Sequence, residues 1–327
     1  MAETLFEARD LSRIFEPARG ALQQLSDRIT GKQPAVVRAV DKVTLSVVEG
    51  ETLGIVGESG CGKSTLARMI TGILPVSGGE RRYRGEDYVS FLARKRDALK
   101  VQMVFQDPMS SLNPRLKVGE IIGEAAALHR VVPRARVRDH VVEMLERVGL
   151  PADTITRYPH QFSGGQRQRI GIARALAVKP ELLVCDEAVA ALDVSVQAQI
   201  INLLMDIRQD SGLSMIFISH DLGLIRHLCD RVAVMYLGRV VELARTEELF
   251  ANPVHPYTQM LLAGMPRISV ERRAFMPIVG EIPSPLHPPS GCHFHPRCSS
   301  ASGHCSRIRP ELSEWTPGHM QACINAG

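Results

Sequence analysis

One segment of the sequence has the residue types and spacing of a phosphate-binding loop. It consists of Gly57, Glu58, Ser59, Gly60, Cys61, Gly62, Lys63, Ser64 and Thr65. A short apolar run before it predicts a strand, and a helical pattern follows it, so that backbone N–H groups and a helix N-terminus face one anion. We expect Lys63 to reach the β- and γ-phosphates of a nucleotide and Ser64 to ligate magnesium. The alternative is a glycine-rich turn that binds nothing, which the complete pattern and its setting disfavour.

Two adjacent carboxylates end a predicted buried strand. The apolar run 182–185 is followed by Asp186 and Glu187. Because neighbouring side chains of a strand point to opposite faces, the two acids cannot have the same role. We assign Asp186 to magnesium, through water, and Glu187 to the general base that polarises an attacking water. Alone, this strand end could be an ordinary surface turn, but the phosphate-binding loop upstream favours catalysis.

A histidine follows a third predicted core strand. His220 comes directly after the run 214–219. The carboxyl ends of parallel strands gather at one edge of an open α/β sheet, so we expect His220 beside the loop and the carboxylates. A neutral imidazole there can donate to a γ-phosphate oxygen and hold the catalytic carboxylate and water in line. A structural histidine is the alternative, which the position after a core strand disfavours.

A second segment also has the composition of an anion site. It reads Phe162, Ser163, Gly164, Gly165 and Gln166, and a helical pattern follows it to residue 177. Ser163, Gly165 and the helix N-terminus are candidate phosphate donors, whereas a glycine-rich helix cap without a ligand is the alternative. Two phosphate surfaces in one chain disfavour a P-loop kinase, since a kinase has no use for the second.

This pair of segments resembles the ABC ATPases. Residues 162–166 are similar to their signature motif, with Phe162 where leucine is usual. The resemblance implies that two subunits pair head to tail. Each ATP is then held between the loop at 57–65 of one subunit and the Ser163 segment of the other.

Further resemblances to this family follow in the expected order. Gln106 is similar to the Q-loop glutamine, residues 191–193 to the D-loop, and His220 to the switch histidine. The resemblance implies that Gln106 contacts magnesium and the attacking water, and that 106–114 contacts a membrane subunit.

Three positions fit the family pattern less closely. Phe15 is a candidate for the aromatic ring that stacks on adenine, and a core phenylalanine is an equal alternative. Ala188 stands where many members have proline, and Ala190 where the D-loop commonly has serine. The second departure puts hydroxyl-mediated contact across the dimer in doubt, but neither touches the groups assigned to hydrolysis.

The elements that position these residues are those of an α/β protein. Short aliphatic runs alternate with helical patterns from about residue 43 to 243, which predicts a mainly parallel sheet with crossover helices. The candidate strands are 52–56, 101–105, 182–186 and 214–219. Helical patterns at 118–128 and 135–148 predict a helical subdomain inserted at about 108–165, and the polar stretch 17–36 predicts a surface loop or hairpin extension.

The two ends of the chain differ in composition. We expect an ABC nucleotide-binding domain at 1–252 and, at 253–327, a small irregular region that is rich in proline and glycine. The formal net charge of +4, from 39 basic and 35 acidic residues, does not indicate a nucleic-acid partner. A start without a signal-peptide layout and the lack of a long apolar stretch predict a protein that reaches a membrane through its partners.

Within the family, the chain resembles the ATPases of bacterial dipeptide and oligopeptide importers. The interval from Gln106 to Ser163 suits a compact helical subdomain and is too short for a long coiled-coil insertion. The segments that carry the resemblance are 105–108, 111–114, 158–160, 194–199 and 252–258. It implies peptide import at the cytoplasmic face of the inner membrane with a homologous ATPase, two permeases and an extracytoplasmic binding protein. Nickel, glutathione and opine-type importers share these motifs, and a non-transport ABC ATPase is a further alternative.

Four of the seven cysteines are clustered near the C-terminus. They are Cys292, Cys298, Cys305 and Cys323. Thiols of a cytosolic chain stay reduced, so in a segment that lacks an apolar core they predict a metal or iron–sulfur clip. The importer resemblance implies a four-iron four-sulfur cluster, as in some members. A zinc site with the nearby His293, His295 or His304, or unligated thiols, are the alternatives.

Overall fold

Short apolar runs of the sequence form the centre of a parallel sheet. The computed structural model describes residues 3–16, 36–94, 97–265 and 280–326. Three strands, β3 (Thr52–Val56), β7 (Leu182–Asp186) and β8 (Ser214–Ile218), are buried along their whole length. Such strands read as continuous apolar runs because both of their faces are covered. β6 (Val101–Val104) pairs in parallel with β7, and β9 (Arg231–Tyr236) with β3. All four predicted strands are present, two of them one residue shorter than expected.

The sheet continues beyond its parallel part into the C-terminal segment. The order of its eight strands in the described residues is β11-β12-β10-β9-β3-β8-β7-β6. The strands β10 (Arg239–Arg245), β12 (His319–Gln321) and β11 (Ser313–Thr316) join this edge in antiparallel pairs. The sequence predicted an irregular region here, because strands of three and four residues are too short to give a periodic signal.

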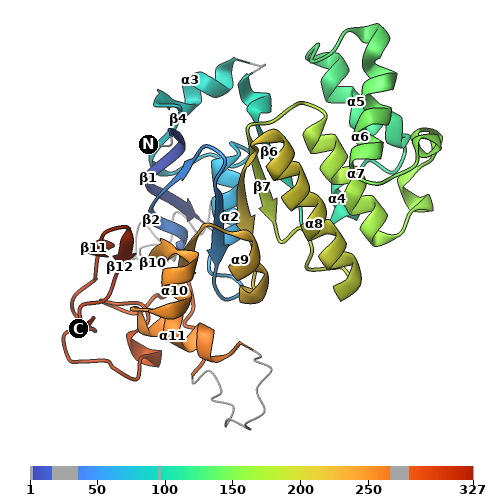
Figure 1. The fold of residues 1–327 in the computed structure, drawn as a ribbon. Coiled ribbons are helices and arrows are strands. Elements are labelled where there is room, and N and C mark those ends of the chain that lie inside the picture. The colour runs from blue at the N-terminus through green and yellow to red at the C-terminus, as the bar shows by residue number, and fades with distance from the viewer. Residues whose placement is uncertain (1–2, 17–35, 95–96, 266–279, 327) are drawn as a thin grey trace, which may run out of the picture.

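Helices cover one face of this sheet. Alternate strand residues such as Leu183 and Cys185 belong to a hydrophobic core on that side. The helices that contribute to the same core include α7 (Gly164–Leu176), α8 (Val194–Ser211) and α9 (Leu222–Leu228). Figure 1 shows α8 and α9 in front of the strands.

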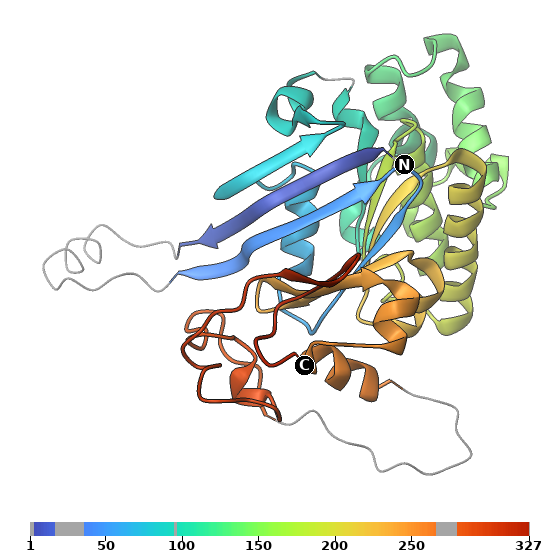
Figure 2. The same cartoon turned by 60° about the vertical axis from the view of Figure 1, so that its left-hand side comes forward.

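The opposite face carries helices and a second sheet. Leu182 and Val184 belong to a second core, together with Leu66 and Met69 of α2 (Lys63–Ile70). The second sheet has the order β2-β1-β4-β5 in antiparallel pairs. Its strands are β1 (Thr4–Phe15), β2 (Val37–Val48), β4 (Gly78–Tyr83) and β5 (Glu86–Asp87), followed by α3 (Tyr88–Ala93). Figure 2 shows β1 and β2 side by side. The predicted loop at 17–36 lies, except for residue 36, outside the described residues.

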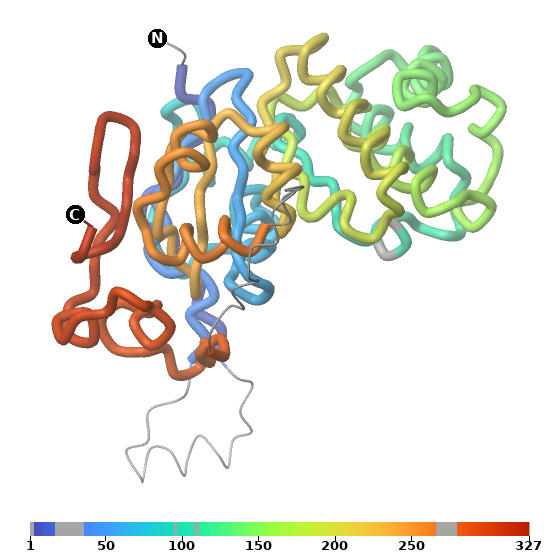
Figure 3. The backbone as a smooth tube through the Cα atoms, turned by 60° about the horizontal axis from the view of Figure 1, so that its bottom comes forward, coloured from blue at the N-terminus to red at the C-terminus, as the bar shows by residue number. Residues whose placement is uncertain are grey.

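A helical subdomain interrupts the α/β core after β6. It contains α4 (Pro108–Ser111), α5 (Val118–Leu128) and α6 (Val137–Arg147). α5 has the predicted bounds, whereas the first residues of the predicted helix 135–148 form a 3-10 turn. Figure 3 shows this subdomain (green) and the C-terminal segment (red) at opposite ends of the molecule. No helix of the described residues is long and apolar enough to cross a bilayer.

The C-terminal edge is held by a buried carboxylate. Glu242 of β10 is fully buried and accepts hydrogen bonds from the backbone N–H groups of Val254, at 2.8 Å, and His255, at 3.0 Å. His319 Nε2 of β12 lies 2.7 Å from the same carboxylate. The segment leading to α11 (Pro256–Ala263), which follows α10 (Thr246–Ala251), and strand β12 thus share one anchor.

We expect Glu242→Ala to lower the free energy of unfolding by about 3 kcal/mol, because two buried backbone donors and an imidazole lose their partner. Urea unfolding followed by circular dichroism measures this change. Glu247→Ala, at an exposed position of α10, is the control and should cost less than about 0.5 kcal/mol. Equal stability of the two variants would contradict the role of Glu242 as an anchor.

Candidate nucleotide site

The loop between β3 and α2 is shaped by close approach of neighbouring backbones. Gly62 has φ +105°, and a Cβ atom there would lie 2.1 Å from the carbonyl oxygen of Ala39 in β2. A Cβ atom on Gly57 would lie 2.2 Å from the carbonyl oxygen of Met235 in β9. Only glycine fits at these two positions. The loop is therefore fixed from both sides, and its end leads into the first turn of α2.

Lys63 is the first residue of α2, and its ammonium group turns back over the loop. Its Nζ donates to the carbonyl oxygens of Gly57, at 2.7 Å, and Glu58, at 3.0 Å. The residue is only 5% exposed. Since both partners are neutral carbonyls, the buried positive charge is free to attract a phosphate.

Ser64 and Asp186 are in direct contact. The Ser64 hydroxyl donates to Asp186 Oδ1 at 2.9 Å, which joins the start of α2 to the end of β7. Burial raises the pKa of Asp186 above its usual range, the Ser64 hydrogen bond lowers it, and the nearby charge of Glu187 raises it again. A hydroxyl beside a carboxylate is an oxygen pair of the kind that magnesium binds.

Gln106, Glu187 and His220 also come together. Gln106 Nε2 donates to Glu187 Oε2 at 2.6 Å, and His220 Nδ1 lies 3.8 Å from Glu187 Oε1. Glu187 has φ +48°, a backbone conformation that is strained for a residue with a side chain, and its N–H donates to the carbonyl oxygen of Ile218 in β8. The turn after β7 thereby directs the carboxylate toward the ends of β6 and β8, where the other two residues lie.

The Ser163 segment forms the N-terminus of α7 by a capping box. Ser163 Oγ accepts from the N–H of Gln166 at 3.3 Å, and the Gln166 side chain accepts from the N–H of Ser163 at 3.0 Å. Ser163 and Gly164 are exposed. A Cβ atom on Gly165 would lie 2.4 Å from a methyl carbon of Val196, so glycine permits α7 to approach α8. Among the described residues, no hydrogen bond or ion pair joins this segment to residues 57–65.

Two arginines of α7 hold the segment after Gln106, and sequence patterns gave no sign of them. Arg167 Nη1 contacts Met109 Sδ at 2.7 Å, and its Nε donates to the carbonyl oxygen of Pro159 at 2.8 Å. Arg174 Nη1 donates to the carbonyl oxygen of Ser111 at 2.5 Å. The helix that follows Ser163 is therefore tied to the residues after Gln106.

Phe15 lies at the end of β1, opposite Val37, and is 37% exposed. Its ring contacts the Arg13 guanidinium at 4.8 Å. Ala39, two positions beyond Val37 in the same strand, packs against Gly62 of the loop. The ring thus has an open face one strand away from the loop, and its role in binding adenine stays a prediction.

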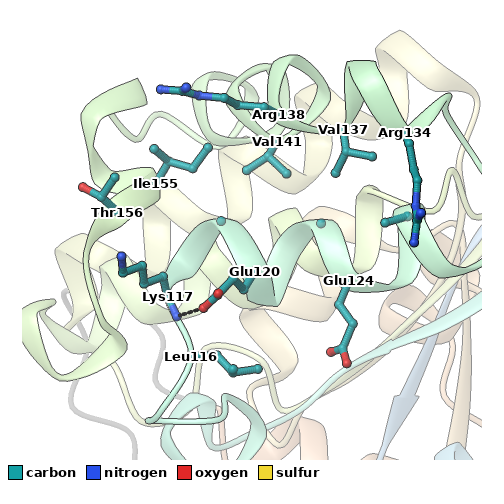
Figure 4. A pocket seen from close by; sticks show the side chains of 13 residues that line it. Leu116, Lys117, Glu120, Glu124, Arg134, Val137, Arg138, Val141, Ile155 and Thr156 are labelled. Atoms are coloured by element: carbon teal, nitrogen blue, oxygen red, sulfur yellow. Dashed lines mark hydrogen bonds between the residues drawn. The ribbon is translucent and has the colours of Figure 1, made fainter.

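A groove with an apolar floor lies in the helical subdomain (Figure 4). It runs between α5, α6 and the 3-10 turn η3 (Ala152–Thr156), with a volume of about 750 Å³. The floor contains Gly119, Gly123, Val137, Val141 and Ile155, and the charged rim contains Lys117, Glu120, Glu124, Arg134 and Arg138. It holds none of the residues assigned to the nucleotide.

The four C-terminal cysteines line one small cavity with Phe294 and His295. Burial raises the pKa of the Cys292, Cys298 and Cys323 thiols, and the other cysteines raise that of Cys292 further. No three His, Cys, Asp or Glu side chains of the described residues are gathered closely enough to hold a metal ion. This finding supports neither the iron–sulfur cluster nor the zinc alternative, and His293 lines a different cavity, beside Arg309.

Fold and site together define an ATPase of the ABC class. The ABC transporter profile matches residues 40–190, and the oligopeptide/dipeptide transporter C-terminal region matches residues 241–305. The solved structure of cbiO1 from Clostridium perfringens, part of an ABC transporter complex, is 26% identical with a TM-score of 0.63 and covers 76% of this chain and 92% of that chain. The fold expectation, an α/β P-loop core with an inserted helical subdomain, is confirmed.

Curated relatives match almost the whole chain. The oligopeptide transport ATP-binding protein OppF of Salmonella typhimurium is 49% identical over 89% of both chains. The dipeptide transport ATP-binding protein DppF of Haemophilus influenzae is 47% identical over 90% of both. The oligopeptide transport ATP-binding protein AppF of Bacillus subtilis is 47% identical over 98% of this chain and 97% of that one. The chain belongs to the ATP-binding, ATP-hydrolysing subunits of ABC transporters, in the group that carries the oligopeptide/dipeptide C-terminal region.

We expect Asp186→Asn to stabilise the fold in magnesium-free buffer at neutral pH by about 0.5–2 kcal/mol. Because the pKa of Asp186 is raised in the folded chain, stability from this group is present at acid pH and is lost as pH rises through the folded-state pKa. Asparagine removes that loss, so the gain should shrink toward acid pH. Urea unfolding at several pH values measures it.

Asp210→Asn, at an exposed position of α8, is the matched control and should leave stability unchanged. A destabilised Asp186→Asn variant, or a gain of equal size at acid and neutral pH, would contradict the assignment of an unfavourable buried charge.

Proposed function

We propose that this subunit supplies ATP hydrolysis for the import of di- and oligopeptides through an ABC transporter. The observation that carries the proposal is near full-length similarity to subunits named for oligopeptide and dipeptide transport, with the C-terminal region of that group. The ATPase does not bind the cargo, so nickel, glutathione or opine-type importers are the alternatives. Uptake of labelled peptides by proteoliposomes that contain the complete complex tests the cargo.

Hydrolysis uses the groups gathered at the strand ends. Lys63 and the backbone N–H groups of residues 60–65 bind the phosphates. Ser64, Gln106 and, through water, Asp186 would hold Mg²⁺, whose charge would offset that of the phosphates. Glu187 accepts the proton of the attacking water. Gln106, bonded to Glu187 at 2.6 Å, orients that water, and His220 donates to the γ-phosphate.

A second subunit completes each site. The Ser163 segment is exposed at the start of a thirteen-residue helix. The Ser163 hydroxyl and the N–H groups of Gly164 and Gly165, which have no partner within the helix, are therefore available to the γ-phosphate of an ATP bound by a partner. The partner is a homologous ATPase subunit, and the pair encloses two ATP molecules head to tail. Phe15 stacks on the adenine. The Arg167 and Arg174 contacts carry a change at Ser163 to the segment after Gln106.

The permease side of the molecule is the region from Gln106 to the helical groove. Residues 106–114 lead directly into the groove of Figure 4, whose lining begins at Leu116. An apolar floor with a charged rim suits a short amphipathic helix of a permease. The subunit accordingly lies at the cytoplasmic face of the bacterial inner membrane, held by two permeases that receive peptide from an extracytoplasmic binding protein. Nucleic acid is not a partner.

The C-terminal cysteines hold a four-iron four-sulfur cluster in this proposal. All four cysteines line one small cavity. Four cysteine thiolates are the usual ligands of such a cluster. When bound, it cross-links a segment with little apolar core of its own, and Cys292, Cys298, Cys305 and Cys323 would be the ligands.

We expect Glu187→Gln to reduce ATP hydrolysis at least about 100-fold while ATP binding persists, because the variant loses its general base and not its phosphate contacts. Phosphate release measures hydrolysis, and size-exclusion chromatography with Mg-ATP should show an accumulated ATP-bound subunit pair. Glu247→Gln, at an exposed position, should hydrolyse normally. A wild-type rate in Glu187→Gln would remove this residue from catalysis.

Anaerobically purified protein should contain about four iron and four acid-labile sulfide per chain. Metal and sulfide analysis measures this content. Cys298→Ser should lower it, whereas Cys229→Ser should retain it, because Cys229 lies in the buried core and not in the cysteine cavity. Zinc without sulfide would contradict the cluster.

A further inference from the structure

A buried ion pair joins the C-terminal segment to the phosphate-binding loop. Arg297 Nη1 donates to Glu58 Oε2 at 2.7 Å, and Arg297 Nη2 donates to Glu58 Oε1 at 2.8 Å. The side chains are 2% and 15% exposed. Two parallel hydrogen bonds between an arginine and a carboxylate are a strong, directional contact. The pair is the more notable because Glu58 is the second residue of the loop that binds phosphate.

We propose that Arg297 is a positioning residue of the nucleotide site, which neutralises Glu58 and thereby sets the affinity of the loop for phosphate. The inference rests on the proposed ATP site at residues 57–65. It adds a residue outside the ABC transporter profile match, so that the C-terminal segment becomes part of the nucleotide site.

Every polar group of Glu58 is engaged by a specific partner. Its backbone N–H donates to the Tyr257 hydroxyl at 3.0 Å, and its carboxylate receives Arg297. Its carbonyl oxygen accepts from Lys63 Nζ at 3.0 Å and from the N–H of Cys61 at 3.3 Å. Tyr257 belongs to α11 and Arg297 to the turn η5 (His295–Arg297). Glu58 therefore contacts both the C-terminal segment and Lys63, the lysine assigned to the phosphates.

The ion pair matters because Glu58 places a negative charge beside the proposed phosphate site. An unpaired carboxylate at Glu58 would repel the phosphates of a nucleotide, and solvent would screen it weakly because the side chain is only 15% exposed. The guanidinium removes this repulsion without competing for the phosphates, since both of its terminal nitrogens face Glu58. Tyr236 and Phe294 flank the guanidinium, with ring centres at 5.8 and 6.0 Å.

The backbone at Arg297 is fixed by the neighbouring residues Cys292 and Cys298. Cys298 follows it directly, and the N–H of His295, at the start of the same turn, donates to the carbonyl oxygen of Cys292 at 3.0 Å. Cys292 and Cys298 both line the cysteine cavity. The residues that shape this cavity therefore also place the guanidinium beneath the loop.

The purified full-length chain tests the proposal by fluorescence titration with Mg²⁺ and N-methylanthraniloyl-ATP. We expect Arg297→Met to raise the Kd roughly tenfold or more. Arg297→Lys keeps the charge but not the paired contact, so its Kd should lie between those of the wild type and Arg297→Met. Adding Glu58→Gln to Arg297→Met should restore most of the lost affinity, because the repelling charge is then gone. A loss of packing alone would not be restored by this second change.

Kinetics of the complete complex give a second readout. Arg297→Met should raise the KM for ATP and leave kcat within about twofold, because Glu187, Gln106 and His220 make their contacts at other strand ends. Arg307→Met, at an exposed position of the same segment, is the matched control and should leave both constants unchanged.

Two results separate failure of this proposal from failure of the ATP site. A wild-type Kd in Arg297→Met, or a folded Arg297→Met/Glu58→Gln variant whose Kd stays as high as that of Arg297→Met, would overturn the role of Arg297. Lys63→Ala should abolish nucleotide binding, and if it binds normally, the proposed ATP site itself is wrong. Circular dichroism of each variant establishes that it is folded.

Discussion

Parallel pairing of the central strands is the constraint on which the nucleotide site depends. Ile218 of β8 pairs with Ile55 of β3 on one side and with Asp186 of β7 on the other. This register puts the phosphate-binding loop, the two carboxylates and His220 at one edge of the sheet. A shift of β7 by one residue would turn Asp186 and Glu187 to the wrong faces and separate Ser64 from its partner. The two hydrophobic cores hold the register, because Leu183 and Leu182 are buried on opposite faces.

The nucleotide site at this edge of the sheet contains several features that are unfavourable for folding. Asp186 is a buried carboxylate beside a second one, Glu187 has a left-handed backbone conformation, and Lys63 is a buried ammonium. The two buried charges become favourable when a polyphosphate and a divalent cation supply the missing opposite charges. The site is therefore built for a ligand that brings both signs of charge, as a magnesium nucleotide does.

The two regions at opposite ends of the molecule act on the site in different ways. The helical subdomain reaches it through Gln106, with Arg167 and Arg174 tying the signature helix to the segment that follows. The C-terminal segment reaches it through Tyr257 and Arg297, which hold the first turn of the loop from behind. In the proposed function, the first connection serves the attacking water and the contact with the permease. The second concerns how strongly the loop attracts phosphate.

The sequence by itself determined the α/β core, the inserted helices and the residues of each motif. Glycine spacing, apolar runs and strand-end acids are local patterns. Each of them predicts one local structure, because that structure is set by the backbone geometry of neighbouring residues. Tertiary structure alone decided that β11 and β12 extend the main sheet, since the partner of a short strand is set by β10, about eighty positions away. It also decided that Arg297 reaches Glu58 and that Arg167 reaches Met109. Contacts between single residues far apart in sequence leave no periodic signal, because they depend on how whole elements pack against each other.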